Sequence, residues 1–240
     1  MSALLSLRDV NKSFGAVKVA DAVSLDLPEG QALGIIGPNG AGKSTLFNLI
    51  GGALPVSSGS VHFAGRDITR APAATRCRLG IARSFQIPHP FVGMSVYENL
   101  LVASHFGGSG HHDAPTECRD ILSRTGLLPL ANQPAGRLTL LQRKRLELAR
   151  ALASGPKLLL LDEIAGGLTE AECADLIDTI RGIHAQGTTI IWIEHVLHAL
   201  TSVVGRLMVL NFGKLLMICE PARTRSTDTI GTSGNDRHAV

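Results

Sequence analysis

Hydrophobic and polar positions follow two patterns along this chain. Residues 4–10 and 22–27 alternate apolar with polar side chains, a period that predicts half-buried strands. Residues 32–36, 158–161 and 188–193 are instead almost continuously apolar. Short continuous runs of this kind are typical of strands that are covered on both faces, as in a parallel sheet.

Helical patterns separate these strands. One helix is expected over 44–50 and another over 170–185, with Thr169 placed to cap the second. Residues 95–154 are predicted to be a set of helices broken by loops, which indicates a helical insertion. Shorter strands are expected at 60–63, 81–85, 207–210 and 215–219. Strands that alternate with helices predict an α/β fold with a mostly parallel central sheet.

Composition and charge narrow the function. A chain of 240 residues with 45% hydrophobic and 18% charged residues is globular and long enough for one domain with an inserted subdomain. The net charge of +3 is spread along the chain, whereas nucleic-acid binders concentrate their basic residues, so no nucleic-acid partner is expected. The densest basic run, Arg143-Lys144-Arg145, is interpreted as the solvated face of a helix.

The sequence gives little support for a metal site, a redox-active cysteine pair or a membrane-spanning segment. The cysteines lie far apart without a CxxC pair, and buried or inert thiols in a reducing cytosol are expected. His111-His112 has no further ligand at metal spacing and is interpreted as a solvated loop. No apolar run approaches the ~18–20 residues that span a bilayer. The first ten residues lack a signal-peptide pattern, so the protein is expected to stay in the compartment where it is made.

A phosphate-binding loop is predicted after the strand at 32–36. The sequence there fits G-x-x-x-x-G-K-[ST], with a buried strand before it and a helix after it. The loop's backbone N–H groups and the helix N-terminus should face phosphate oxygens. Lys43 should neutralise the β- and γ-phosphates of a nucleotide, and Ser44 should offer its hydroxyl to Mg²⁺. The alternative, a glycine-rich turn with a chance lysine, does not explain these flanks. The expected nucleotide-binding residues are Gly37, Asn39, Gly40, Ala41, Gly42, Lys43, Ser44 and Thr45.

An acidic pair follows the four leucines at 158–161. Asp162 can hold Mg²⁺ directly or through water. Glu163 is placed to act as the general base toward an attacking water. An acidic pair at a strand end can also be a helix cap, but together with the phosphate loop it indicates nucleotide hydrolysis.

At this point the chain resembles the ABC ATPase family from about residue 4 to residue 219. Residues 37–45, GPNGAGKST, match its usual phosphate loop. The resemblance implies that Gln86 is the Q-loop glutamine that contacts Mg²⁺ or the water. It implies that His195 is the switch histidine that contacts the γ-phosphate, and that Phe14 stacks on adenine. Without the surrounding motifs, Gln86 would be interpreted as a surface loop residue, His195 as a satisfied polar group and Phe14 as a core phenylalanine.

The implied fold is a phosphate-loop NTPase of the ABC type. It has a mostly parallel central sheet, an N-terminal antiparallel β subdomain and an inserted helical subdomain. We expect a single ABC ATPase domain over 1–225, with the helical subdomain at about 88–154 and a flexible tail at 226–240. The implied cofactors are ATP and Mg²⁺, and the implied Mg²⁺ ligands are Ser44, Gln86 and Asp162.

The signature motif departs from the family pattern Leu-Ser-Gly-Gly-Gln. Here it is 138–142, LTLLQ, in which Thr139 keeps a hydroxyl for the γ-phosphate and Gln142 keeps the amide, while both glycines are leucine. The next loop also differs, with Gly166-Gly167-Leu168-Thr169 in place of Ser-Ala-Leu-Asp and Ile164 in place of proline. Because the family holds ATP between two subunits, we expect an asymmetric pair with unequal sites: a heterodimer, with a homodimer as the alternative.

Within the family, the chain looks like the ATPase subunit of branched-chain amino-acid importers. The stretches 80–86, 145–153 and 209–214 carry this likeness. It implies a peripheral protein at the cytoplasmic face of the bacterial inner membrane. Its partners would be a second ATPase subunit and transmembrane permease subunits, with a periplasmic substrate-binding protein acting indirectly. The segment 87–99, with Pro88, Pro90 and Phe91, is expected to dock a helix of the permease.

Three alternatives stay open. Similar importers carry other amino acids, amides or aromatic acids. A non-transport ABC protein acting on ribosomes or DNA would typically have two cassettes or a long coiled coil, and this chain has neither. A kinase with the same loop would need an acceptor pocket and would not need Gln86, residues 138–142 and His195 in this order.

Overall fold

The computed structural model describes residues 3–108 and 113–221. The predicted tail at 226–240 and the pair His111-His112 lie outside these residues. The strands are β1 (Ala3–Phe14), β2 (Val17–Pro28), β3 (Ala32–Ile36), β4 (Ser58–Phe63), β5 (Arg66–Asp67), β6 (Ile81–Arg83), β7 (Leu158–Asp162), β8 (Thr189–Ile193), β9 (Arg206–Asn211) and β10 (Lys214–Cys219). The helices are α1 (Lys43–Gly51), α2 (Ala73–Arg78), α3 (Val96–Phe106), α4 (Ala114–Arg124), α5 (Leu140–Ala153), α6 (Glu170–Ala185) and α7 (Leu197–Thr201), with short 3₁₀ turns at Leu128–Leu130 and Ala135–Arg137.

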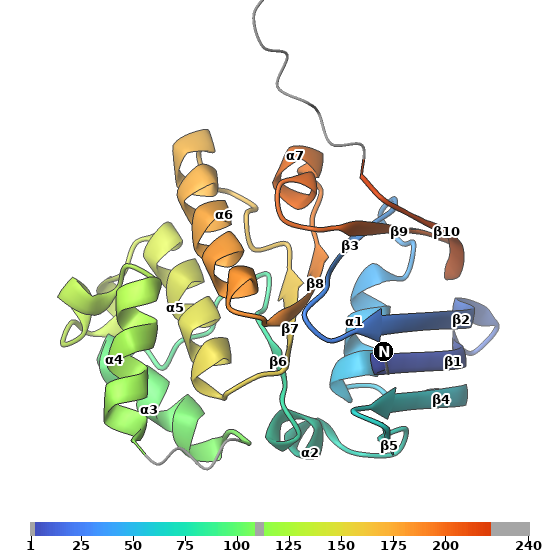
Figure 1. Ribbon diagram of the computed structural model, residues 1–240, viewed down its shortest axis with the longest axis horizontal. Helices are drawn as coiled ribbons and strands as arrows, with labels where there is room; N and C mark the ends of the chain where they lie inside the picture. Colours follow the sequence, from blue (N-terminus) through green and yellow to red (C-terminus); the bar gives the residue numbers. More distant parts are fainter. Residues whose placement is uncertain (1–2, 109–112, 222–240) are drawn as a thin grey trace, which may run out of the picture.

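Two sheets organise the fold, and both were expected from the sequence. The order β2-β1-β4-β5 forms an antiparallel sheet, and β10-β9-β3-β8-β7-β6 forms a second one. In the second sheet all neighbours are parallel except the edge strand β10, which runs antiparallel to β9. Helix α1 lies between the two sheets with α2 packed against its end, and helices α3 to α6 lie on the other side of the parallel strands (Figure 1). The predicted α/β class with a mostly parallel central sheet and an antiparallel subdomain is confirmed.

The continuous apolar runs are explained by two hydrophobic cores on opposite faces of the parallel strands. In β7, Leu158 and Leu160 pack into the core around α1, while Leu159 and Leu161 pack into the core of the helical side. Strand β8 alternates in the same way, with Trp192 on the helical side and Ile193 on the α1 side. Because each face meets a buried layer, these strands are apolar except at their ends, Asp162 in β7 and Thr189 in β8.

Helices α3, α4 and α5 group together beside the sheet (Figure 1). Two of them begin with reciprocal caps, Ser95 with Glu98 for α3 and Thr139 with Gln142 for α5. The predicted cap Thr169 is confirmed at the start of α6, where its hydroxyl accepts from the backbone N–H of Glu172. Each such cap satisfies N–H groups that a helix leaves unpaired at its first turn.

Some predicted bounds were wrong. The expected strand at 81–85 ends at Arg83, because only β6 residues 81–83 pair with β7. The first strand extends to Phe14 and the second begins at Val17, because the two strands pair as a hairpin. The sequence reading did not predict β5, α2 or α7, which have two, six and five residues.

The solvated-face interpretation of 143–145 was also wrong for Lys144. This residue is 3% exposed, since it shares the buried face of α5 with Leu148, one turn later. Burial lowers the pKa of Lys144, and the charges of Glu194 and Glu163 act in the opposite direction. The basic run therefore places one ammonium group in the interior, toward the carboxylates described below.

Candidate functional site

The predicted site residues follow neighbouring strands of the parallel sheet. The order β3-β8-β7-β6 places the phosphate loop, His195, Asp162-Glu163 and Gln86 after consecutive strands. Loops after parallel strands meet at the carboxyl edge of a sheet, where open α/β folds bind ligands. Segments that are up to 158 residues apart in the sequence, 37–195, are thereby brought to one edge.

The phosphate loop packs tightly against its surroundings. A Cβ at Gly37 would lie 2.1 Å from the Leu210 carbonyl oxygen, and one at Gly42 would lie 2.4 Å from the Val19 carbonyl oxygen. Gly42 adopts φ 97° and caps α1, so glycine is required there for conformation as well as for space. The N–H of Gly213 donates to the Ala41 carbonyl at 2.9 Å and holds the loop from behind.

Lys43 lies across its own loop. Its Nζ donates to the carbonyl oxygens of Gly37 at 2.8 Å and Pro38 at 3.1 Å, and the residue is 6% exposed. Among the described residues, its ammonium group has no carboxylate within ion-pair distance. A buried cation held only by carbonyls, at the first position of a helix, suits an anionic ligand.

Glu163 stands at the centre of the predicted catalytic residues. Its Oε2 accepts from Gln86 Nε2 at 2.5 Å, and its Oε1 lies 2.9 Å from His195 Nε2. Its backbone has φ 45°, in the left-handed region that non-glycine residues seldom occupy. The backbone N–H of Glu163 donates to Ile193 at the end of β8, at 2.9 Å. The structure thus brings the three residues together at one carboxylate.

Two charged residues beside these groups were missed by the sequence reading. Arg83 forms an ion pair with Asp162, Nη2 to Oδ2 at 2.7 Å, with side chains only 16% and 8% exposed. Glu194 is buried and accepts from the backbone N–H of Ala165 at 2.7 Å and of His195 at 3.0 Å. Glu194 therefore ties the loop after Glu163 to the loop that carries His195. A charged residue at the end of an apolar strand was the available signal in both cases.

The remaining predicted residues lie in other parts of the fold. Phe14 ends β1 in the antiparallel sheet and is half exposed, with Lys12 Nζ 5.1 Å from its ring centroid. Thr139 and Gln142 contact each other in the cap of α5, and among the described residues neither is hydrogen-bonded to the phosphate loop. These two residues are therefore not joined to the edge where the carboxylates meet.

The two departures from the family pattern touch each other. The Leu140 Cδ2 atom lies 3.5 Å from the place where a Cβ on Gly167 would sit. Leu140 is 46% exposed, and Gly167 has φ 77°, where a side chain would be strained. The leucine of the altered signature thus lies against the glycine of the altered loop, and the pair presents an apolar surface at the start of α5.

The donor set fits a nucleotide with Mg²⁺. Hydroxyl, carboxylate and amide oxygens, which Ser44, Asp162 and Gln86 supply, are the hard ligands that Mg²⁺ prefers. The tight cradle at 37–44 and the buried ammonium of Lys43 fit a phosphate chain. None of the helices in the described part of the chain is long and apolar enough to span a membrane.

This combination of a parallel sheet, a phosphate loop and a carboxylate pair after a buried strand defines a phosphate-loop nucleotide-binding ATPase. Residues 20–166 match the family described as ABC transporter. The chain belongs to this ABC family and is an ATPase that binds and hydrolyses ATP.

Known relatives extend the likeness over the whole cassette. The chain is 34% identical over 243 residues to the high-affinity branched-chain amino acid transport ATP-binding protein LivG of Salmonella typhimurium, covering 95% of each chain. It is 35% identical over 235 residues to the xylose import ATP-binding protein XylG of Yersinia pestis, covering 96% of this chain and 46% of that protein. The ADP conformation of MJ1267, an ATP-binding cassette of an ABC transporter, matches with a TM-score of 0.84 and 32% identity, covering 92% of both chains.

Proposed function

We propose that this chain powers an importer of branched-chain or related amino acids, as a peripheral subunit on the cytoplasmic face of the membrane. The main support for this proposal is the 34% identity to LivG over 95% of both chains. The likeness to XylG has similar identity but spans less than half of that protein. Because the match to LivG extends over nearly all of both chains, the amino-acid importer is favoured, and a sugar or another small organic solute is the alternative.

The carboxyl edge of the sheet supplies the groups for hydrolysis. Ser44, Asp162 and Gln86 would hold Mg²⁺, which neutralises phosphate charge when it is bound. Lys43 and the loop N–H groups would hold the β- and γ-phosphates, and Phe14 would stack on adenine. Glu163 would take a proton from the attacking water. His195 and Gln86 support this role, because they hold both carboxylate oxygens of Glu163 in place.

A second ATPase subunit would complete the site. Thr139 and Gln142 lie at the start of α5 with no hydrogen bond to this chain's own phosphate loop, which supports a role facing the loop of a partner. The chain's own loop would in turn face the partner's signature. The exposed Leu140 beside Gly167 would then lie in the partner's site, where the family has a glycine that lets the backbone approach phosphate.

We therefore expect unequal sites in the assembled pair. Glu163→Gln in this chain should abolish most of the hydrolysis, whereas the matching substitution in the partner should leave most of it. The reason is that only the partner's phosphate loop meets the altered signature. Steady-state phosphate release from the two single variants and the wild-type pair measures this, with nucleotide binding as the control. Equal losses in the two variants would contradict the asymmetry.

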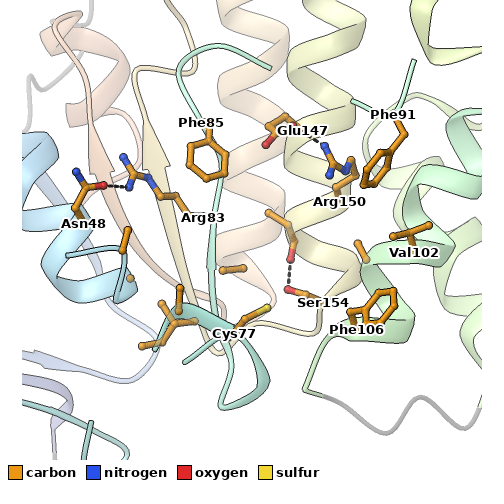
Figure 2. Close-up of a pocket in the computed structure, with 17 residues that line it drawn as sticks. Asn48, Cys77, Arg83, Phe85, Phe91, Val102, Phe106, Glu147, Arg150 and Ser154 are labelled. Carbon is orange, nitrogen blue, oxygen red and sulfur yellow. Dashed lines mark hydrogen bonds and ion pairs between the residues drawn. The ribbon is translucent and has the colours of Figure 1, made fainter. Parts of the chain in front are cut away.

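A groove between the sheet and the helical side supports the docking of the permease. It has a volume of about 400 Å³ and runs between α1, α2, β6, α3 and α5 (Figure 2). Phe91 stands at its edge, 44% exposed, with the Arg150 guanidinium 5.0 Å from its ring centroid. Arg150 also donates to the His89 carbonyl at 2.8 Å and so fixes the segment that carries Phe91. A mostly apolar groove with aromatic edges suits one amphipathic helix of a membrane subunit.

Phe91→Asp should weaken membrane assembly while the isolated chain still binds ATP. A carboxylate at the groove edge would be desolvated by an apolar helix, and we expect roughly a tenfold or greater loss of membrane-bound protein. Arg150 would face the new carboxylate, so the fold should tolerate it. Membrane fractionation and a nucleotide-binding titration measure the two properties.

The matched control is Leu216→Asp. Leu216 is 59% exposed on β10, outside the groove. It should leave assembly unchanged. If Phe91→Asp assembled like the wild type, or lost ATP binding, the groove would not be the docking site.

The substrate is tested by uptake in cells that lack this gene. We expect the wild-type gene to restore uptake of labelled leucine, isoleucine or valine but not of xylose, urea or aromatic acids. Restoration of xylose uptake alone would favour the sugar importer, and restoration of no solute would contradict the importer.

A further inference from the structure

Arg83 occupies a position between the carboxylate edge and the docking groove. It is the last residue of β6, and its guanidinium forms two charge-assisted contacts. One is the ion pair with Asp162 at 2.7 Å, and the other is a hydrogen bond from Nη1 to Asn48 Oδ1 at 2.5 Å. The cation also lies over the rings of Phe47 at 5.6 Å and Phe85 at 5.1 Å from their centroids. Four neighbours, from α1, β7 and the loop after β6, therefore fix one planar group.

The same side chain forms part of the groove wall. Asn48, Arg83 and Phe85 all line the groove, and Figure 2 shows Arg83 between the other two, with its hydrogen bond to Asn48. Phe85 is 49% exposed, so a helix that entered the groove would contact this ring directly. Any shift of the ring would change the packing of the guanidinium that holds Asp162.

The segment 83–86 contacts both carboxylates of the acidic pair. Arg83 holds Asp162, and three residues later Gln86 holds Glu163. The two contacts serve different groups, because Asp162 is the proposed Mg²⁺ ligand and Glu163 the proposed base. Arg83 thus contacts the proposed Mg²⁺ ligand Asp162, whereas Gln86, itself a proposed Mg²⁺ ligand, contacts the proposed base Glu163.

We propose that Arg83 is a positioning residue that couples the docking groove to the Mg²⁺ ligand Asp162. This rests on the proposed function for the roles of Asp162 and of the groove. The guanidinium holds the Oδ2 atom of Asp162, and the carboxylate oriented in this way would be a ligand for the ion. Such coupling is reciprocal. If a helix in the groove changes the affinity for Mg²⁺ by a certain factor, then bound Mg²⁺ changes the affinity of the groove for that helix by the same factor.

Arginine is specifically suited to this role. A lysine ammonium could pair with Asp162 but could not also hold Asn48 and stack on two rings in one plane. Removal of the cation would leave a nearly buried carboxylate without its partner and free to reorient. The expected consequence is a defect in Mg²⁺ binding that exceeds any defect in nucleotide binding.

The first test is binding of a fluorescent ATP analogue to the full chain during a Mg²⁺ titration. Arg83→Met should raise the half-saturating Mg²⁺ concentration about tenfold. This is the lower end of the loss in metal affinity that is typical when a group that orients a metal ligand is removed. Binding of the analogue without Mg²⁺ should be unchanged, and Arg83→Lys should lie in between. Arg78→Met, an exposed arginine on α2, is the matched control and should have no effect. An unchanged Mg²⁺ curve, or equal losses with and without Mg²⁺, would overturn the proposal.

The second test reads the groove itself. Cys77 lines the groove, while Cys118 and Cys173 are buried, so a bimane label in a Cys219→Ser background goes to Cys77. Adding Mg²⁺ to the nucleotide-bound chain should shift the bimane emission, and Arg83→Met should abolish the shift at saturating Mg²⁺. A shift that persists in Arg83→Met, or is absent from the wild type, would overturn the coupling. Both tests use the isolated chain, so they succeed or fail independently of the uptake assay that tests the importer.

Discussion

Glu163→Gln is expected to bind ATP normally and to hydrolyse it about 10³-fold more slowly, within the range that general-base catalysis contributes. The substitution keeps the size of the side chain and removes its ability to accept a proton at neutral pH. Both carboxylate oxygens are engaged in the structure, by Gln86 and His195, so the amide can keep a hydrogen bond on at least one side. The loss should therefore fall on turnover and leave the nucleotide site formed.

The measurement is single-turnover phosphate release beside an equilibrium ATP-binding titration. Glu170→Gln makes the same chemical change at an exposed position at the start of α6 and serves as the matched control. It should behave like the wild type. Near-normal turnover of Glu163→Gln would remove this residue from its proposed role.

Lys43→Ala should weaken ATP binding by about 10–100-fold, the range for one lost charge-assisted hydrogen bond. Lys43 is nearly buried, and only carbonyl oxygens of its own loop hold its ammonium group. Such a cation is stabilised when an anion replaces those carbonyls. The variant should therefore fold without ligand and lose most of the stabilisation that ATP gives.

Thermal unfolding with and without ATP, together with a binding titration, measures this effect. Lys157→Ala removes an exposed lysine just before β7 and is the matched control. It should keep the full ATP-induced shift in melting temperature. An equal shift in Lys43→Ala would show that the ammonium does not hold the phosphates.

The sequence predicted those parts of the fold that depend on local pattern. The leucines at 158–161 indicated a strand with two buried faces, and the structure places them alternately in two cores. Thr169 was recognisable as a cap because its hydroxyl serves N–H groups only a few residues away. The phosphate loop was identified by its G-x-x-x-x-G-K-[ST] pattern and the acidic pair by its place after four leucines, whereas the role expected of His195 came from the resemblance to the family.

Contacts between distant segments were not predictable in the same way. Arg83 and Asp162 are 79 residues apart and meet only because β6 and β7 are parallel neighbours. The burial of Lys144 depends on which face of α5 packs against the core, and a basic run alone favours the solvated face. The contact of Leu140 with Gly167 joins two unusual stretches whose relation is visible only in three dimensions.

The central claim, that this ATPase drives solute import, is tested most directly by uptake in cells without the gene, complemented with wild type or Glu163→Gln. Both proteins should be found at the membrane in equal amounts, because the substitution leaves the groove unchanged. Wild type should restore uptake of one class of solute, with branched-chain amino acids expected, and Glu163→Gln should restore none. Equal uptake with both proteins would contradict a transport role that depends on hydrolysis at Glu163.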